Sequence, residues 1–180
     1  MAEPLLGEVG ADATVINEDK EAVAKAVTAE AVATAGYDSV EAAAKDGIAF
    51  VFMGHGTSHT AKVSYSQMQT AMQTMGYDNV FIGTVEGEPE STSCENVIEA
   101  VKAAGYTKVV LRPLMVVAGD HANNDLAGPE EDSWASRIKA AGMTPMPNLK
   151  GLGQLKGIQD IFLSHTQNAV ADLANTKKAD

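Results

Sequence analysis

Ile48-Ala49-Phe50-Val51-Phe52-Met53 is a continuous apolar run that ends at Gly54. Both faces of such a run are apolar, so it predicts a β-strand buried on both sides, as in a parallel sheet covered by helices. Apolar runs at 80–85 and 108–114 predict two more strands, and 143–149 predicts a short fourth. The run at 48–54 therefore indicates the central part of a sheet.

Helical segments separate these strands. We expect them near 60–75, 92–104, 132–141 and 156–174, and a glycine follows each of the first three, as is common at helix ends. Strands that alternate with helices predict an α/β fold, with a parallel sheet flanked by helices. The phrase Gly-Tyr recurs at 36–37, 76–77 and 105–106, which we interpret as repeated turn chemistry and not as a repeat architecture.

The first quarter of the chain has a different composition. Residues 1–47 hold ten acidic and three basic side chains, many alanines and few large apolar residues. Asn17 is a plausible N-cap for a helix near 18–35, and Gly36 is its expected stop. We expect residues 1–47 to form an N-terminal extension, one exposed helix plus a linker, and residues 48–180 to form the α/β domain.

The composition excludes several classes of protein. The 180 residues include 13 basic and 24 acidic side chains, a net charge of −11 that argues against a nucleic-acid partner. The single Cys94 excludes an internal disulfide framework and an all-cysteine metal cluster. No apolar run approaches the length of a membrane span, and residues 1–4 do not resemble a signal peptide. We expect a cytoplasmic protein; a periplasmic location stays open if a leader was removed.

In open parallel sheets, ligands bind beyond the carboxyl ends of the strands. The first such segment is Gly54-His55-Gly56-Thr57-Ser58-His59, in which His55 stands between two glycines that allow close backbone approach. The alternative is a strand-to-helix turn capped by Thr57 or Ser58. His59 is expected to start the helix and face solvent.

Two more segments follow the next strands. Glu86 stands at the second strand end and is a candidate pocket residue; the alternative is an acidic helix start. After the third strand, Leu114, Met115 and Val116 lead into Gly119-Asp120-His121. This apolar wall would suit a large flat ligand with a polar centre, whereas the alternative is a turn in which Asp120 caps a short helix.

His55 and His121 would share one edge of the sheet, where neighbouring strands lie about 4.8 Å apart. Two imidazoles there could hold one Co²⁺, Ni²⁺, Fe²⁺ or Zn²⁺ ion, or accept protons near neutral pH. Two ligands are too few for a structural zinc site, which is normally closed at four, and they suit an ion that is handed on. His165 is expected to be a surface or packing residue.

Several motifs together resemble a known family, the anaerobic sirohydrochlorin cobaltochelatases, class II chelatases of cobalamin biosynthesis. The resemblance runs from about residue 48 to the C-terminus. The motifs that carry it are Val51-Phe52-Met53-Gly54-His55-Gly56 with Ser58-His59, Val85-Glu86 with Pro89-Glu90, Pro113-Leu114-Met115-Val116-Val117-Ala118-Gly119-Asp120-His121-Ala122-Asn123-Asn124-Asp125, Asp132-Ser133-Trp134 and Gly151-Leu152-Gly153.

This resemblance implies one half of a bilobal fold, with a tetrapyrrole in the cleft between two similar halves. Residues 3–6 and 18–35 resemble the last strand and last helix of the first half. In the family two histidines, matching His55 and His121, and one glutamate face the metal; the glutamate lies in the first half, and this chain has no copy of it. The chain is then truncated, pairs with a separate first half, or pairs with itself as a homo-oligomer.

The implied function is ATP-independent insertion of Co²⁺ into sirohydrochlorin, with Ni²⁺ or Fe²⁺ as other metals. His55 and His121 would be the catalytic and metal-binding residues. Substrate-binding roles are expected for Gly54, Glu86, Leu114, Met115 and Val116, and Arg112 and Lys62 would offset the substrate carboxylates. The alternative is a binding module that holds haem or another tetrapyrrole through His55 or His121 without catalysis.

Overall fold

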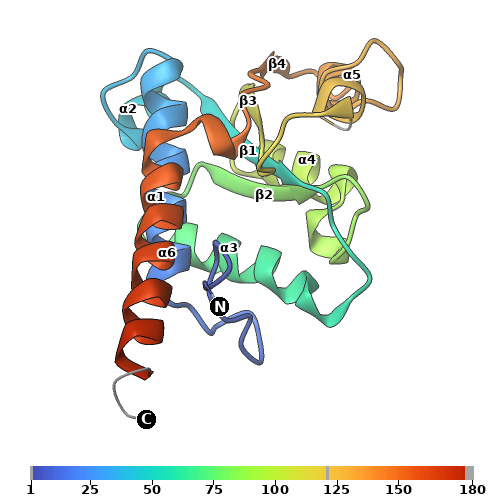
Figure 1. Ribbon diagram of the computed structural model, residues 1–180. Helices are drawn as coiled ribbons and strands as arrows, with labels where there is room; N and C mark the ends of the chain where they lie inside the picture. Colours follow the sequence, from blue (N-terminus) through green and yellow to red (C-terminus); the bar gives the residue numbers. More distant parts are fainter. Residues whose placement is uncertain (1, 121, 177–180) are drawn as a thin grey trace.

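The protein, in a computed structural model that describes residues 2–120 and 122–176, is built on one four-stranded sheet (Figure 1). The strands are β1 (Ile48–Gly54), β2 (Val80–Thr84), β3 (Lys108–Pro113) and β4 (Thr144–Pro147). All pairs are parallel, and the spatial order is β2-β1-β3-β4. The predicted α/β fold is confirmed, and β1 lies inside the sheet as its two-sided apolar character requires.

Helices cover both faces of this sheet. They are α1 (Glu18–Thr34), α2 (Val40–Lys45), α3 (Val63–Thr74), α4 (Cys94–Ala103), α5 (Trp134–Ala140) and α6 (Lys156–Thr176). One-turn 3₁₀ helices lie at Thr60–Lys62, Glu90–Thr92 and Leu152–Gln154, and a π-helical turn lies at Ala122–Leu126. The expected helices form within a few residues of their predicted bounds, whereas α2 was not predicted. None of the described helices has the length and apolarity that crossing a membrane requires.

Successive side chains of β1 point to opposite faces and build two separate cores. Ile48, Phe50 and Phe52 pack with α1, α2 and α3, whereas Ala49, Val51 and Met53 pack with α4 and α5. All seven residues of the strand are buried. This two-sided burial explains why the run contains no polar residue.

The helix α1 belongs to the first core, so the expectation of an exposed helix is wrong. Val23, Val27 and Ala31 are fully buried against the sheet and α3. Residues 5 and 6 form a turn, so the strand suggested for 3–6 is absent too. The assignment of residues 1–47 to the end of a first half stays a prediction.

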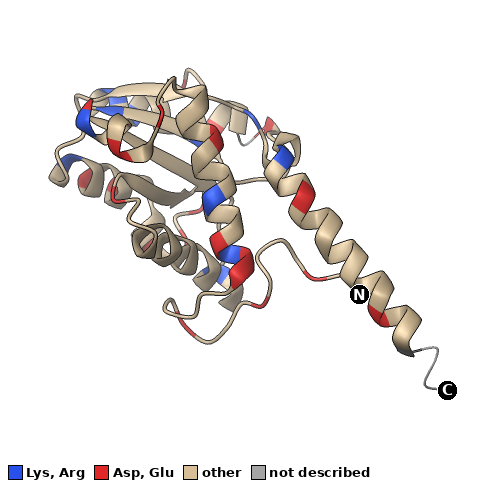
Figure 2. Cartoon of the chain, turned by 90° about the vertical axis from the view of Figure 1, so that its left-hand side faces the viewer, with Lys and Arg blue, Asp and Glu red and all other residues tan. Residues whose placement is uncertain are grey.

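The helix ends follow the predicted chemistry. The Asn17 side chain accepts a hydrogen bond from the backbone N–H of Lys20 at 2.9 Å and caps α1. Gly36, Gly76 and Gly105 all have positive φ and end α1, α3 and α4 in the same way. At the far end of the chain, α6 lies along α1 and then extends away from the rest of the molecule (Figure 2).

Candidate functional site

Three chain segments lie side by side at the carboxyl edge of the sheet. The backbone N–H of Leu114 donates to Met53 O at 2.7 Å, and the N–H of Glu86 donates to His55 O at 2.9 Å. These bonds continue the ladder beyond the strands, so the loop after β1 is held between the segments that follow β2 and β3. The predicted edge therefore forms, with His55 at its centre.

His55 is exposed at this edge. Its Nδ1 lies 3.2 Å from Gly56 O, and because a carbonyl oxygen only accepts, Nδ1 carries the proton of that contact. In the neutral ring the lone pair is then on Nε2, the nitrogen suited to a metal ion or a proton.

Gly54 and Gly56 fix the backbone of the His55 loop. A Cβ at Gly54 would lie 2.3 Å from Tyr65 Cε1, so only glycine lets this ring pack there. The Tyr65 hydroxyl accepts a hydrogen bond from the N–H of Gly56 at 3.0 Å. The structure thus gives Gly54 a packing role, and its contact with a substrate stays a prediction.

An apolar cavity of about 400 Å³ adjoins this loop. Leu114 and Val116 line it together with Thr57, Tyr65 and Leu152, and residues 4–7 and Val9 complete the wall. Val116 is 50% exposed. Met115 points to the opposite face and packs against the second core, so the structure separates it from Leu114 and Val116.

The segment after β3 is supported by the backbone of Gly151-Leu152-Gly153. The N–H groups of Leu152 and Gly153 donate to Met115 O and Val116 O at 2.8 and 2.9 Å. A Cβ at Gly151 would lie 2.8 Å from Val116 O. Glycine is therefore required for two backbones to meet here, which positions Val116 at the cavity.

Glu86 is exposed and lines a different cavity, of about 410 Å³, with Asp125, Asp132 and Arg137. It still adjoins the His55 loop, because a Cβ on Gly56 would lie 2.9 Å from Glu86 Cβ. Cys94 lines the same cavity, and burial raises the pKa of its thiol to about 12, so it is neutral at physiological pH.

His121 lies outside the described residues. Of its neighbours, Asp120 is exposed and Ala122 is buried, and the N–H of Asn123 donates to Gly119 O at 3.0 Å. The convergence of His121 with His55 stays a prediction.

The two basic residues differ in their access to this edge. Arg112 is 2% exposed and forms an ion pair with Glu30, so the expectation that it offsets substrate carboxylates is wrong. The Lys62 side chain is 40% exposed, and its Nζ forms an ion pair with Glu88 at 2.8 Å, so it remains at the surface. His59 is exposed at the start of the helical segment, as expected, and its Nδ1 accepts from the N–H of Ala61 at 3.1 Å, so His59 is the cap in place of Thr57 or Ser58.

Part of the wall of the apolar cavity was not predicted from the sequence. Tyr65 lies in the helix that follows the His55 loop, Leu152 lies almost 100 residues further along the chain, and residues 4–9 were expected to belong to a separate extension. The two glycines of Gly151-Leu152-Gly153 were a signal of close backbone approach, although they did not indicate the partner segment.

A family model described as "Cobalt chelatase (CbiK)" matches residues 1–171. The sirohydrochlorin cobaltochelatase of Salmonella typhimurium is 41% identical over 120 residues, which is 67% of this chain and 44% of that protein. The sirohydrochlorin cobaltochelatase CbiKC of Nitratidesulfovibrio vulgaris is 34% identical over 176 residues, 93% of this chain and 61% of that protein. The chain thus spans about half the length of these curated relatives, and the family match includes residues 1–47. The chain belongs to the cobalt chelatase (CbiK) family.

Proposed function

We propose that this chain supplies the histidine-bearing half of a sirohydrochlorin cobaltochelatase, which inserts Co²⁺ into a tetrapyrrole without ATP. The observation that carries the proposal is the exposed His55, which stands between two glycines at the carboxyl edge, in a loop whose Thr57 lines an apolar cavity. Membership of the cobalt chelatase family supports the assignment. A cytoplasmic location stays a prediction.

Insertion exchanges two pyrrole N–H protons for one Co²⁺, so no electron is transferred. The ion must lose water while the ring nitrogens lose their protons. In our proposal Nε2 of His55 and the imidazole of His121 bind the incoming Co²⁺. Once the ion has passed to the ring nitrogens, one imidazole accepts one of the two protons and solvent water accepts the other. Two protein ligands leave coordination positions open for water and then for the pyrrole nitrogens.

The surroundings of His55 suit such a substrate. Leu114 and Val116 offer apolar surface to one face of a macrocycle, whereas Lys62 offers a positive charge for its carboxylates. Glu86 and Met115 do not line the apolar cavity, so in our proposal they would contact the substrate only outside it. The second wall of the cleft would come from another α/β unit, a separate first half or a second copy.

The first test is metal insertion into sirohydrochlorin by the purified chain with Co²⁺, Ni²⁺ or Fe²⁺. We expect insertion with Co²⁺, and we expect His55→Ala to lower the rate about 100-fold or more, because ligand and proton acceptor are both lost. His59→Ala is the matched control, since His59 only caps a 3₁₀ turn and should leave the rate unchanged. Insertion at the parent rate by His55→Ala would reject the assignment.

A non-catalytic tetrapyrrole-binding module is the second candidate. It is favoured by the exposure of His55 beside the apolar cavity, which would suffice for axial ligation of haem. Added haemin would then give a Soret band that disappears in His55→Ala, with no insertion of any of the three metals. Insertion of Co²⁺ by the parent chain would exclude this reading of the site.

A further inference from the structure

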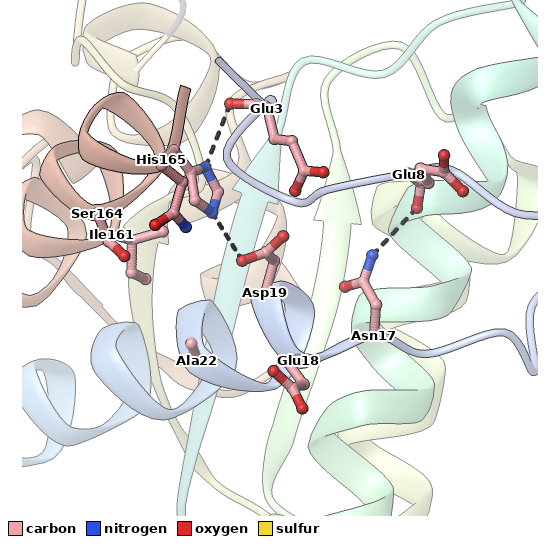
Figure 3. A pocket seen from close by; sticks show the side chains of 10 residues that line it. Glu3, Glu8, Asn17, Glu18, Asp19, Ala22, Ile161, Ser164 and His165 are labelled. Atoms are coloured by element: carbon pink, nitrogen blue, oxygen red, sulfur yellow. Dashed lines mark hydrogen bonds and ion pairs between the residues drawn. The ribbon is translucent and has the colours of Figure 1, made fainter. Parts of the chain in front are cut away.

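Three potential metal ligands meet where the N-terminal segment, α1 and α6 come together (Figure 3). They are Glu3, Asp19 and His165, and one ligand atom of each lies within 4.8 Å of the other two. His165 is 8% exposed. Within the described part of the chain, no other group of three such side chains is this close.

The hydrogen bonds of His165 define where a cation is needed. Nδ1 lies 3.2 Å from the backbone oxygen of Glu3, which can only accept, so Nδ1 carries a proton. Nε2 lies 2.8 Å from Asp19 Oδ1. In a neutral ring the Nε2 lone pair would face the lone pairs of a carboxylate. A second proton or a metal ion must therefore lie between these two atoms.

The distance between His165 Nε2 and Asp19 Oδ1 allows either a proton or a metal ion between them. The hydrogen bond to Asp19 raises the pKa of His165, although burial of the ring opposes this. For a metal ion with bonds of about 2.1 Å, two adjacent ligands lie roughly 3.0 Å apart in octahedral and about 3.4 Å apart in tetrahedral coordination, so the 2.8 Å contact would widen slightly when an ion binds. An Nδ1–H that donates to a backbone carbonyl is also the usual support for a histidine that binds metal through Nε2.

The surroundings favour a doubly charged ion. A cavity of about 600 Å³ opens beside the three residues, and Glu8 and Glu18 line it as well. The nearby Lys20 does not line it, because its Nζ donates to Leu6 O and Glu8 O at 2.9 and 2.6 Å. Four carboxylates thus face this space with one imidazole, and the cavity has room for water ligands.

We propose that Glu3, Asp19 and His165 bind one divalent first-row transition ion, such as Zn²⁺ or Co²⁺, through one nitrogen and two carboxylate oxygens. The ion would connect the N-terminal segment to α1 and α6. Residues 4–7 of that segment line the apolar cavity beside the His55 loop, so the ion would hold a wall of that cavity in place. This site does not include His55 or His121, and it does not depend on the proposed cobalt insertion.

The experiment uses the full chain, stripped of metal, with both chelatase histidines removed by His55→Ala and His121→Ala. Co²⁺ is titrated in by calorimetry and by its visible absorption. We expect one equivalent to bind and the thermal midpoint to rise with Co²⁺ concentration, as for any ligand of the folded state. Adding His165→Gln should abolish both effects, and adding Glu3→Gln should lower the affinity about tenfold or more.

His59→Ala in the same background is the matched control and should leave Co²⁺ binding unchanged. Glu3 is exposed, so Glu3→Gln tests the site without endangering the fold. Absence of stoichiometric Co²⁺ binding in the double variant would overturn the site. An affinity for Co²⁺ that neither Glu3→Gln nor His165→Gln lowers would overturn it as well. Neither result bears on metal insertion by the parent chain, so the two proposals fail separately.

Discussion

The ring of Tyr65 lies against the backbone of Gly54, in the place that any larger side chain would occupy. Gly54→Ala should therefore force the ring away, and we expect it to lower the free energy of unfolding by about 1–3 kcal/mol. Loss of the Tyr65 hydrogen bond to the N–H of Gly56 would also loosen the His55 loop. Urea unfolding measures the first effect.

Gly119→Ala is the control for this substitution. No atom lies within 4 Å of the Cβ that it adds, so its effect on stability should stay within about 0.5 kcal/mol. Equal losses in the two variants would show that Tyr65 is not the cause.

Single residues also show where prediction from sequence works. The position of His59 at a helix start and the positions of Gly54 and His55 at a strand end were predictable, because such features are local. Arg112 was misjudged, because its partner Glu30 lies 82 residues away and no local pattern indicates the pair. Tyr65 was not predicted for a different reason: Gly54 is only 11 residues away, but their contact depends on how α3 packs on the end of β1.

Among the elements, α1 differs most from its expected place. Its buried side chains are mainly alanine and valine, with Lys20 and Thr28, so it lacks the large apolar stripe that usually marks a core helix. Small side chains let the helix approach the sheet and α3 closely. Strand and helix bounds were predictable from apolar runs and glycine stops, whereas the burial of α1 depended on partners that composition does not show.

One ion-pair cluster attaches α1 to the sheet. Glu30 of α1 pairs with the buried Arg112 of β3 and with Lys150 at 2.8 Å. Burial alone would raise the pKa of Glu30, but hydrogen bonds and charges from Lys150 and Arg112 outweigh it and lower the pKa. A carboxyl with a lowered pKa stabilises the fold at neutral pH, and this contribution is lost as the pH falls through that pKa.

Glu30→Gln should thus destabilise the protein by about 2–3 kcal/mol at pH 7, because Arg112 keeps its buried charge without a partner charge. The difference between parent and variant should shrink as the pH falls through the lowered pKa of Glu30, because Glu30 itself then becomes neutral. Guanidinium unfolding over a pH series measures this, with Glu21→Gln, an exposed residue of the same helix, as the control. A difference that does not change with pH would contradict the ion-pair explanation.

The whole molecule keeps an apolar surface on its longest helix. Ile158 and His165 of α6 face the body and are buried. Leu163, Val170 and Leu173 lie on another side of the same helix, and they are 55%, 61% and 59% exposed. A helix with apolar residues on two sides packs between two partners, and α6 has one of them in this chain (Figure 2).

We expect a second copy to cover this side of α6 when the chain is purified alone. A second copy carries the same apolar side on its own α6, so two copies can cover each other's Leu163, Val170 and Leu173.

The sequence predicted the layers of one α/β unit, but neither the strand order nor the exposure of the second apolar side of α6 follows from strand and helix patterns.

Leu163→Glu places a charge in the middle of this surface and should convert the self-associated chain to an 18.8 kDa monomer. Light scattering coupled to gel filtration, over a range of protein concentrations, measures the change. Asn175→Glu adds the same charge at an exposed position on the opposite side of α6, away from Leu163 and Val170, and should leave the assembly intact. A parent chain that stays monomeric at every concentration would contradict self-pairing, because a surface that a second copy covers must be covered more as concentration rises.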